Sequence, residues 1–241
     1  MTTNNNIVDC ACVIHGQAYE WIYVDKLYSM LTRNFTFPVR LHVFTEQERT
    51  VPAPYVKHEL INWPSIHGPR RAWWYKVQLF NSNYFQGRLL YFDLDVVITG
   101  NLDWILQSSP HYFWAIKDFT YMWRPKWEGI NSSIMYWDTT KFNRVWENFE
   151  SQPLDTVTRS HKGDQDYISA SIPLNERRFF DDSLVKSWRW NVKDGGLNHS
   201  TKIYNRPSAG SILPPNTKIV VFHGKPKPHE VDDSLTNTHW K

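Results

Sequence analysis

The sequence predicts an α/β protein with a mostly parallel, doubly wound sheet and flanking helices. Apolar strand-like segments alternate with segments of helical periodicity up to about residue 98. A length of 241 residues is enough to bury a sizeable core. Two aspartates stand where the fourth strand-like segment ends, and sheets of this kind bind ligands beyond the carboxyl ends of their strands.

Strands and helices alternate in the first part of the chain. We predict strands at 8–14, 39–44 and 56–61, the last of them the weakest, and a fourth from residue 88 onward. A loop rich in proline, glycine and histidine precedes the second helix. The predicted apolar faces are Val24, Leu27, Tyr28 and Leu31 for the first helix, and Trp73, Val77, Phe80 and Tyr84 for the second.

The later part of the chain predicts shorter elements. A short helix is expected at 101–107, and strands are expected at 112–116, 131–137 and 218–222. Another short helix begins at Gly163 and ends before Pro173, and the segment 151–163 is a weak candidate linker. Asp138 is placed to cap a helix with the apolar face Phe142, Val145, Trp146 and Phe149.

Composition and charge narrow the possible functions. A net charge of +3, with no dominant basic block, is too small to indicate a nucleic-acid binder. The polar N-terminus lacks the features of a signal peptide, and no apolar run approaches a membrane span. Cys10 and Cys12 would be neighbours on one strand face, a poor geometry for a disulfide, so we predict reduced thiols and a cytoplasmic location.

Two aspartates, Asp93 and Asp95, stand one residue apart at the end of an apolar run. In a strand, their side chains would point to the same face. Neighbouring carboxylates repel each other unless a divalent metal or a shared proton lies between them. The alternative is that one caps a turn while the other is solvated, but the apolar run favours burial. The pair therefore predicts a metal and phosphate site.

Four separated motifs occur in a recognisable order: Asp93-Leu-Asp95, Asn131-Ser-Ser, Gly163-Asp-Gln-Asp and His223-Gly-Lys. Together they resemble the nucleotide-sugar-dependent glycosyltransferases of the GT-A fold, a Rossmann-like α/β fold, and most closely the retaining, glycogenin-like family 8. The resemblance spans residues 8 to about 230. It implies one GT-A domain over 1–241, with a nucleotide-binding part at about 7–100 and an acceptor and C-terminal part at about 101–241.

The resemblance implies an enzyme of hexosyltransferase type. It would transfer a sugar, with retention, from a nucleotide diphosphate donor, UDP-linked, to a glycan or another hydroxyl acceptor. A divalent cation would neutralise the leaving diphosphate. Asp93, Asp95 and His223 match its ligands in the family, and a carboxylate and imidazole set suits Mn²⁺ better than Ca²⁺, with Mg²⁺ as the other candidate. Taken alone, a histidine at a strand end is more often an ordinary surface or core residue.

Donor-binding residues also follow from the resemblance. Gly224, Lys225 and Lys227 match the diphosphate-binding segment. The family's glycine and lysine usually lie farther beyond the histidine, so either Lys225 or Lys227 could contact the diphosphate. Lys76 corresponds to a basic residue that reaches the donor, with a snorkelling surface lysine as the alternative. Tyr19 lies where the family places an aromatic residue against uracil, although it could equally pack on a helix face.

The residues nearest the reacting sugar are implied in the same way. Asp164 and Gln165 match the family's pair beside the anomeric carbon, but local sequence fits Asp164 equally well as a helix N-cap. Asn131 matches an asparagine that faces the donor or acceptor sugar. Ser133 stands in place of the family's usual glycine, which changes how closely a ligand can approach the backbone.

Two other functions fit parts of the sequence. Asp93 and Asp95, with Val97 following, also fit the nucleophile and acid of haloacid-dehalogenase-type phosphatases, although three predicted strands precede them here. A non-catalytic module that binds nucleotide sugars or glycans is the other alternative. The sequence does not identify the nucleotide, the sugar, the acceptor, the oligomeric state or the pathway.

Overall fold

The computed structural model describes residues 7–66, 71–196 and 210–241. The chain divides into two compact units that alternate along the sequence, and each unit has its own sheet. Unit 1 comprises Met1–Glu20, Phe37–Asp93 and Ser108–Phe179, and unit 2 comprises Trp21–Thr36, Leu94–Gln107 and Phe180–Lys241.

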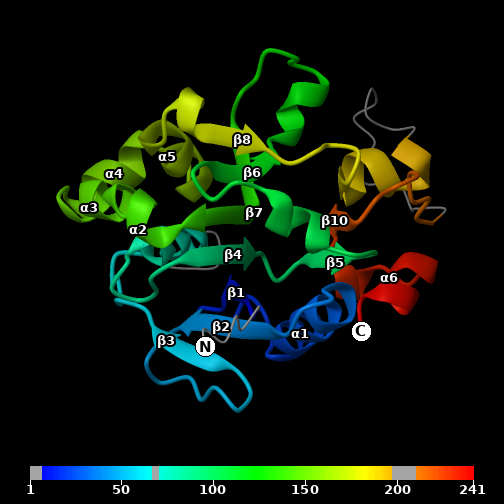
Figure 1. Ribbon diagram of the computed structural model, residues 1–241, viewed down its shortest axis with the longest axis horizontal. Coiled ribbons are helices and arrows are strands. Elements are labelled where there is room, and N and C mark those ends of the chain that lie inside the picture. Colours follow the sequence, from blue (N-terminus) through cyan, green and yellow to red (C-terminus); the bar gives the residue numbers. More distant parts are fainter. Residues whose placement is uncertain (1–6, 67–70, 197–209) are drawn as a thin grey trace, which may run out of the picture. The chain divides into compact units, whose positions relative to one another are not determined.

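Unit 1 is built on a seven-stranded sheet with the strand order β3-β2-β1-β4-β7-β6-β8 (Figure 1). The β3-β2-β1-β4 half is parallel, and β7 runs antiparallel to both β4 and β6. The predicted α/β class with a mostly parallel sheet is confirmed. The strands are β1 (Val8–Val13), β2 (Val39–Thr45), β3 (Val56–Glu59), β4 (Arg88–Phe92), β6 (Phe113–Lys117), β7 (Ile130–Asp138) and β8 (Arg177–Phe179).

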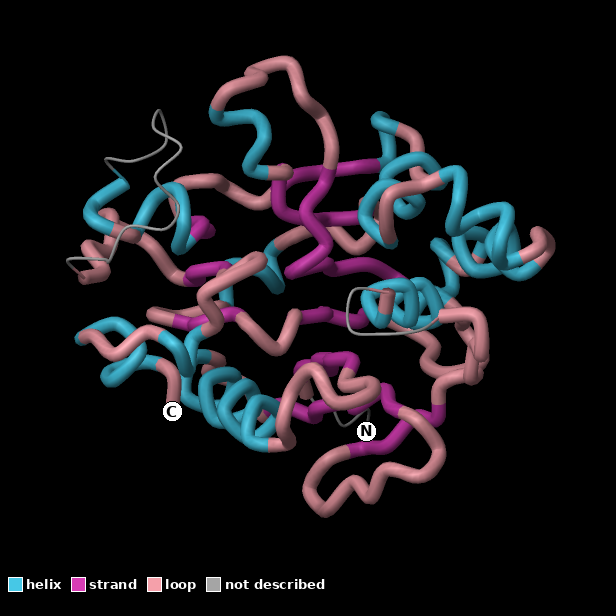
Figure 2. Tube along the Cα trace, turned by 180° about the vertical axis from the view of Figure 1, so that it is seen from behind, coloured by secondary structure: helices cyan, strands magenta, loops and turns pink. Residues whose placement is uncertain are grey.

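The helices of unit 1 share one hydrophobic core with this sheet, and α2 to α5 gather into a single group (Figure 2). Asp138 caps α2 as predicted, because its carboxylate accepts the N–H groups of Thr140 and Lys141. The predicted face Phe142, Val145, Trp146 and Phe149 is buried. The helices are α2 (Thr139–Phe142), α3 (Arg144–Glu150), α4 (Leu154–Ser160) and α5 (Asp164–Ser171), with 3₁₀-helices at Ala72–Phe80, Phe119–Met122 and Leu174–Glu176.

The second predicted helix differs from the expectation. It is a 3₁₀-helix, Ala72–Phe80, in which every residue from Trp74 onward is buried, so it has no single apolar stripe. Trp73 is 39% exposed and Tyr84 lies beyond the helix, so both were wrongly placed on the buried face. A segment enclosed on all sides does not show the amphipathic pattern on which the prediction depended.

The predicted strand from residue 88 onward is interrupted. β4 ends at Phe92, β5 begins at Val96, and Asp93 to Asp95 form the connection between the two sheets. The expectation that the two aspartates lie on one strand, with their side chains on the same face, was therefore wrong. The apolar run continues because β5 is itself a buried strand, but in a different sheet.

Unit 2 has a three-stranded sheet of order β5-β10-β9, packed against α1. The predicted strand at 218–222 is β10, which belongs to this sheet. In α1, Val24, Leu27 and Leu31 are buried as predicted, whereas Tyr28 is only partly buried and Tyr23 and Met30 face the core. The elements are α1 (Ile22–Asn34), β5 (Val96–Ile98), β9 (Val185–Ser187), β10 (Ile219–Val221), α6 (Ser234–His239), a π-helix at Trp188–Val192 and 3₁₀-helices at Asp103–Gln107, Asp194–Gly196 and Pro228–Glu230.

The segment 151–163 is not a linker. It contains α4, and the chain on both sides of it belongs to unit 1. Cys10 and Cys12 are buried free thiols, as predicted. Within the described part of the chain, no helix is both long enough and apolar enough to cross a bilayer.

Three neighbouring strands of unit 1 carry a hydrogen-bonded chain of titratable side chains. On β2, Nε2 of His42 lies 2.9 Å from Oδ1 of Asp9 on β1. Nδ1 of His42 lies 2.8 Å from Nε2 of His58 on β3. Arg40 also pairs with Asp9. Burial, assisted by the neighbouring His42, lowers the pKa of His58 from 6.5 to about 4.

We expect the protein to lose stability as the pH falls from 6.5 to 4. The unfolded chain binds a proton at His58 in this window while the folded chain does not, so protonation favours unfolding. His58 is partly exposed, and after discounting for solvent screening the loss is about 1–2 kcal/mol. Chemical denaturation at several pH values should show a flatter profile for His58→Gln. An unchanged slope in this variant would contradict the assignment.

Candidate active site

A buried lysine lies between two aspartates in unit 1. Nζ of Lys76 lies 2.8 Å from Oδ1 of Asp93 and 3.5 Å from Oδ2 of Asp164. It also contacts Oγ of Ser132 at 3.1 Å, and that hydroxyl donates to Oδ2 of Asp164 at 2.6 Å. The hydroxyl of Tyr91 donates to Oδ1 of Asp93 at 2.6 Å. Lys76 is only 8% exposed, so the surface-lysine alternative is wrong.

The 3₁₀-helix Ala72–Phe80, β4, β7 and α5 bring these side chains together. Asp93 directly follows β4, and its N–H donates to the carbonyl of Ser133 on β7, which fixes the end of the strand pair. Asp164 is the first residue of α5, and the N-cap position is Gly163, which has no side chain to cap with. Asp164 is therefore not the N-cap, and its carboxylate instead takes part in the Lys76 cluster.

The two carboxylates have different acidities. Burial raises the pKa of Asp93, but the charge of Lys76 and hydrogen bonds from Lys76, Tyr91 and Ser133 outweigh it, so the net pKa is lowered. Burial also raises the pKa of Asp164, and there Lys76 and Ser132 only partly offset it, so the net pKa is raised. Environments that separate the pKa values of paired acids are common in active sites.

The other predicted residues of unit 1 lie on or next to these elements. Asn131 is buried on β7, and its side-chain oxygen accepts the N–H of Ser133 at 3.0 Å. Nε2 of Gln165, on α5, donates to Oδ2 of Asp118 at 3.1 Å. Tyr19 lies in the loop that follows β1 and is partly buried.

Unit 2 brings a second group together at one end of its sheet. β10 runs antiparallel to β5, and the N–H of Phe222 donates to the carbonyl of Asp95 at 3.1 Å, so Asp95 and His223 lie at the same end. Lys227 forms an ion pair with Asp95, which is 5% exposed. Nε2 of His223 lies 2.7 Å from Oγ of Ser187.

The segment after His223 is held by further contacts. Lys225 pairs with Glu230 and is largely exposed, so the two candidate lysines have different partners. Gly224 has φ +79°, and a Cβ there would lie 3.0 Å from the guanidinium of Arg189. That guanidinium donates to the carbonyl of Lys225 at 2.6 Å. The positive φ at 224 therefore favours glycine, while a Cβ there would displace only the flexible end of Arg189.

The predicted metal ligands fit a divalent ion in their chemistry, because they offer two carboxylates and an imidazole. They are not gathered into a preformed metal centre: across residues 7–66, 71–196 and 210–241, no group of three or more His, Cys, Asp or Glu side chains could hold an ion. Lysines neutralise both carboxylates, Lys76 at Asp93 and Lys227 at Asp95. An ion would have to compete with these lysines.

Sequence reasoning missed four residues that support the site. Ser132 and Tyr91 hydrogen-bond to the two acids of unit 1, Asp118 holds Gln165, and Ser187 holds His223. Ser132 lies inside the Asn131-Ser-Ser motif, and Tyr91 lies two residues before Asp93. Both could therefore have been proposed as site residues from the sequence. Asp118 and Ser187 are distant in sequence from any motif, and only the fold reveals them.

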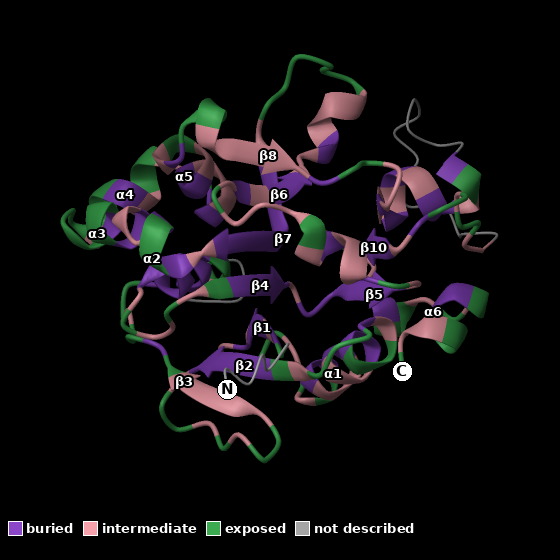
Figure 3. Ribbon diagram, in the orientation of Figure 1, coloured by how far each residue is buried: buried purple, intermediate pink, exposed green. Residues whose placement is uncertain are grey.

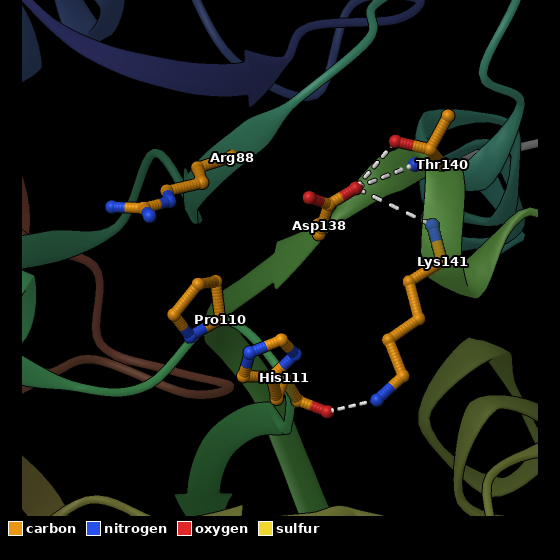
Figure 4. Close-up of a pocket in the computed structure, with 6 residues that line it drawn as sticks. All are labelled: Arg88, Pro110, His111, Asp138, Thr140 and Lys141. Atoms are coloured by element: carbon orange, nitrogen blue, oxygen red, sulfur yellow. Dashed lines mark hydrogen bonds between the residues drawn. The ribbon is translucent and has the colours of Figure 1, made fainter.

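A cavity of about 500 Å³ lies elsewhere in unit 1. It is lined by residues that include Arg88, at the start of β4, and Asp138, at the end of β7 (Figure 4). These two residues pair in the sheet register. They therefore mark the end of β4 opposite to Asp93. Because its lining includes none of the predicted site residues, this cavity is not the candidate site.

Comparison with solved structures identifies the fold class: the chain has the GT-A fold of glycosyltransferases. The glycosyltransferase GlyE of Streptococcus pneumoniae TIGR4 superposes with a TM-score of 0.66 at 14% identity, over 97% of this chain and 60% of GlyE. The galactosyltransferase LgtC, solved with donor and acceptor sugar analogues, superposes with a TM-score of 0.57 at 12% identity, over 95% of this chain and 91% of LgtC.

A third similar structure is the bifunctional glycosyltransferase WbbM, with a TM-score of 0.57 at 13% identity over 94% of this chain and 48% of WbbM. The chain thus spans about three fifths of GlyE and about half of WbbM. No protein-family model matches the sequence, and no curated protein does. Identities this low establish the fold alone.

Proposed function

We propose that this protein is a glycosyltransferase that transfers a sugar from a nucleotide diphosphate donor, with UDP as the nucleotide, to a glycan or another hydroxyl acceptor, with retention of configuration. The observation that carries the proposal is the buried Lys76 between Asp93 and Asp164, at the carboxyl end of β4 in a GT-A fold. Ligands of such sheets bind at the carboxyl ends of the strands.

The charge of the cluster suits sugar transfer. Cleavage of a glycosidic bond to phosphate develops positive charge at the anomeric carbon, and a fixed carboxylate beside that carbon stabilises it. We assign this role to Asp164. Ser132 and Lys76 both bind its Oδ2, so the carboxylate is oriented before a donor arrives. Gln165 and Asn131 would contact the sugars with their amide groups.

The diphosphate would be bound mainly by the segment that follows His223. Lys225, Lys227 and Gly224 are the proposed phosphate contacts, and Tyr19 is the proposed contact of the base. Asp93, Asp95 and His223 would hold Mn²⁺ or Mg²⁺, which would neutralise the leaving diphosphate. The placement of Asp95 and His223 at the same end of the unit 2 sheet supports this ligand set.

Nucleotide release tests the proposal. We expect the wild type to release UDP from at least one UDP-sugar in the presence of Mn²⁺ or Mg²⁺, and to lose this activity in excess chelator. Asp95→Asn should lower the rate by about 10-fold or more, because it removes a charged ligand of the cation. Asp155→Asn is the matched control, since Asp155 is an exposed surface residue. Undiminished release in chelator would exclude the metal.

The same assay separates the alternative functions. A phosphatase would hydrolyse a phosphomonoester and trap labelled phosphate on Asp93, with no requirement for a nucleotide sugar. A non-catalytic module would show a donor-dependent rise in melting temperature without any UDP release. Either result would replace the proposed transfer reaction.

A further inference from the structure

The connection between β6 and β7 carries two exposed tryptophans. This loop, residues 118–129, is closed by the N–H of Asp118, which donates to the carbonyl of Gly129 at 2.9 Å. Trp123 is 50% exposed and Trp127 is 41% exposed. The residues between them, 124–126, are exposed as well (Figure 3). Large apolar side chains gathered on an exposed loop indicate a binding surface.

The tip of this loop is conformationally restricted. The N–H of Trp127 donates to the carbonyl of Arg124 at 2.8 Å, which closes a turn that contains Pro125. A Cβ at Gly129 would lie 2.5 Å from Nε1 of Trp127, so the indole rests against the backbone of this glycine. Aromatic side chains held in place before binding lose little entropy when a ligand arrives.

The base of the loop is connected to the candidate active site. Oδ2 of Asp118 accepts the hydrogen bond from Gln165 at 3.1 Å. Oδ1 of Asp118 accepts the N–H of Thr120 at 2.7 Å, which starts the 3₁₀-helix leading to Trp123. One carboxylate therefore fixes both the residue beside the proposed reaction centre and the start of the tryptophan loop.

We propose that Trp123 and Trp127 form the acceptor platform of the enzyme, and that the acceptor is an acidic glycan. This inference rests on the proposed glycosyl transfer and deepens it by naming the substrate class. Sugar rings present C–H groups of partial positive charge, which pack on the electron-rich face of an indole. Arg124 and Lys126, exposed between the two tryptophans, add positive charge that pairs with the carboxylate, sulfate or phosphate groups of an acidic saccharide.

The base of the loop favours a glycan over a lipid surface. Tryptophan, arginine and lysine also occur at membrane interfaces, so the tip alone fits either surface. A lipid anchor would not need the hydrogen bond between Asp118 and Gln165. An acceptor must reach the reacting sugar, and the Asp118 contact provides that connection.

Glycan binding tests the inference without catalysis. On an array of neutral and acidic oligosaccharides, we expect the wild type to bind acidic members. Trp123→Leu/Trp127→Leu should weaken this binding by about 10-fold or more, whereas Trp123→Phe/Trp127→Phe should retain most of it, because only phenylalanine keeps an aromatic face. Arg124→Gln/Lys126→Gln should lower affinity for acidic members and reduce its salt dependence. Leu174→Ala, at another exposed apolar residue of unit 1, should bind as the wild type does.

Three results would overturn the inference: equal binding by the leucine and phenylalanine variants, no binding of any glycan by the wild type, or binding only to vesicles of anionic phospholipid. Melting temperatures confirm that each variant is folded. Failure of the proposed transfer reaction would appear separately, as absence of UDP release by the wild type.

Discussion

Asp164→Asn should reduce the rate of sugar transfer by about 10²–10³-fold, the range observed when one group that stabilises transition-state charge is removed. Asparagine has the same shape, and its oxygen can still accept the hydrogen bond from Ser132. It lacks the negative charge that would face the anomeric carbon. Donor affinity should change much less than the rate, because the carboxylate acts mainly in the transition state.

The fold should tolerate this change. Asp164 is not the N-cap of α5, so no capping interaction is lost. Lys76 keeps Asp93 as a partner at 2.8 Å, and the variant has one fewer buried charge, so stability should change by only about 1 kcal/mol. Asp166→Asn on the same helix is the matched control. If both variants transfer sugar at the wild-type rate, Asp164 has only a structural role.

The sequence predicted the class of the fold because the parallel strands β1, β2 and β4 are long enough to show as apolar runs. It did not predict β8 and β9, which have three residues each and too little length for any periodicity. It also merged β4 and β5 into one strand. Both are buried, so hydrophobicity continues across the boundary while the chain changes sheets.

The candidate site could be predicted in part. Motif resemblance identified Asp93 and Asp164, and the structure joins them through Lys76. The partners of Gln165 and His223 could not be predicted, since Asp118 and Ser187 come from distant parts of the chain. The sequence also could not show that Lys225 and Lys227 have different partners. Only the folded structure shows that Lys227 pairs with Asp95 and Lys225 with Glu230.

Lys76→Met should destabilise the protein by about 3–5 kcal/mol, because it leaves the buried Asp164 and the partly buried Asp93 without their shared cation. Methionine preserves the length and apolar contacts of the lysine stem, so the loss would be electrostatic. Lys162→Met, at an exposed position close in sequence to Asp164, is the control and should be nearly neutral. Urea denaturation measures both variants.

The cause of the Lys76→Met loss can be isolated in two ways. The unpaired acids should acquire raised pKa values in the folded state, so the folded variant binds more protons than the unfolded chain above about pH 4. Its stability deficit should therefore shrink as the pH falls toward 4.

Lys76→Met/Asp164→Asn should be more stable than Lys76→Met alone, with a coupling energy of about 0.5–3 kcal/mol, because one unpaired carboxylate is gone. Strictly additive effects would mean that Lys76 and Asp164 do not interact, and would remove the observation on which the proposed function depends.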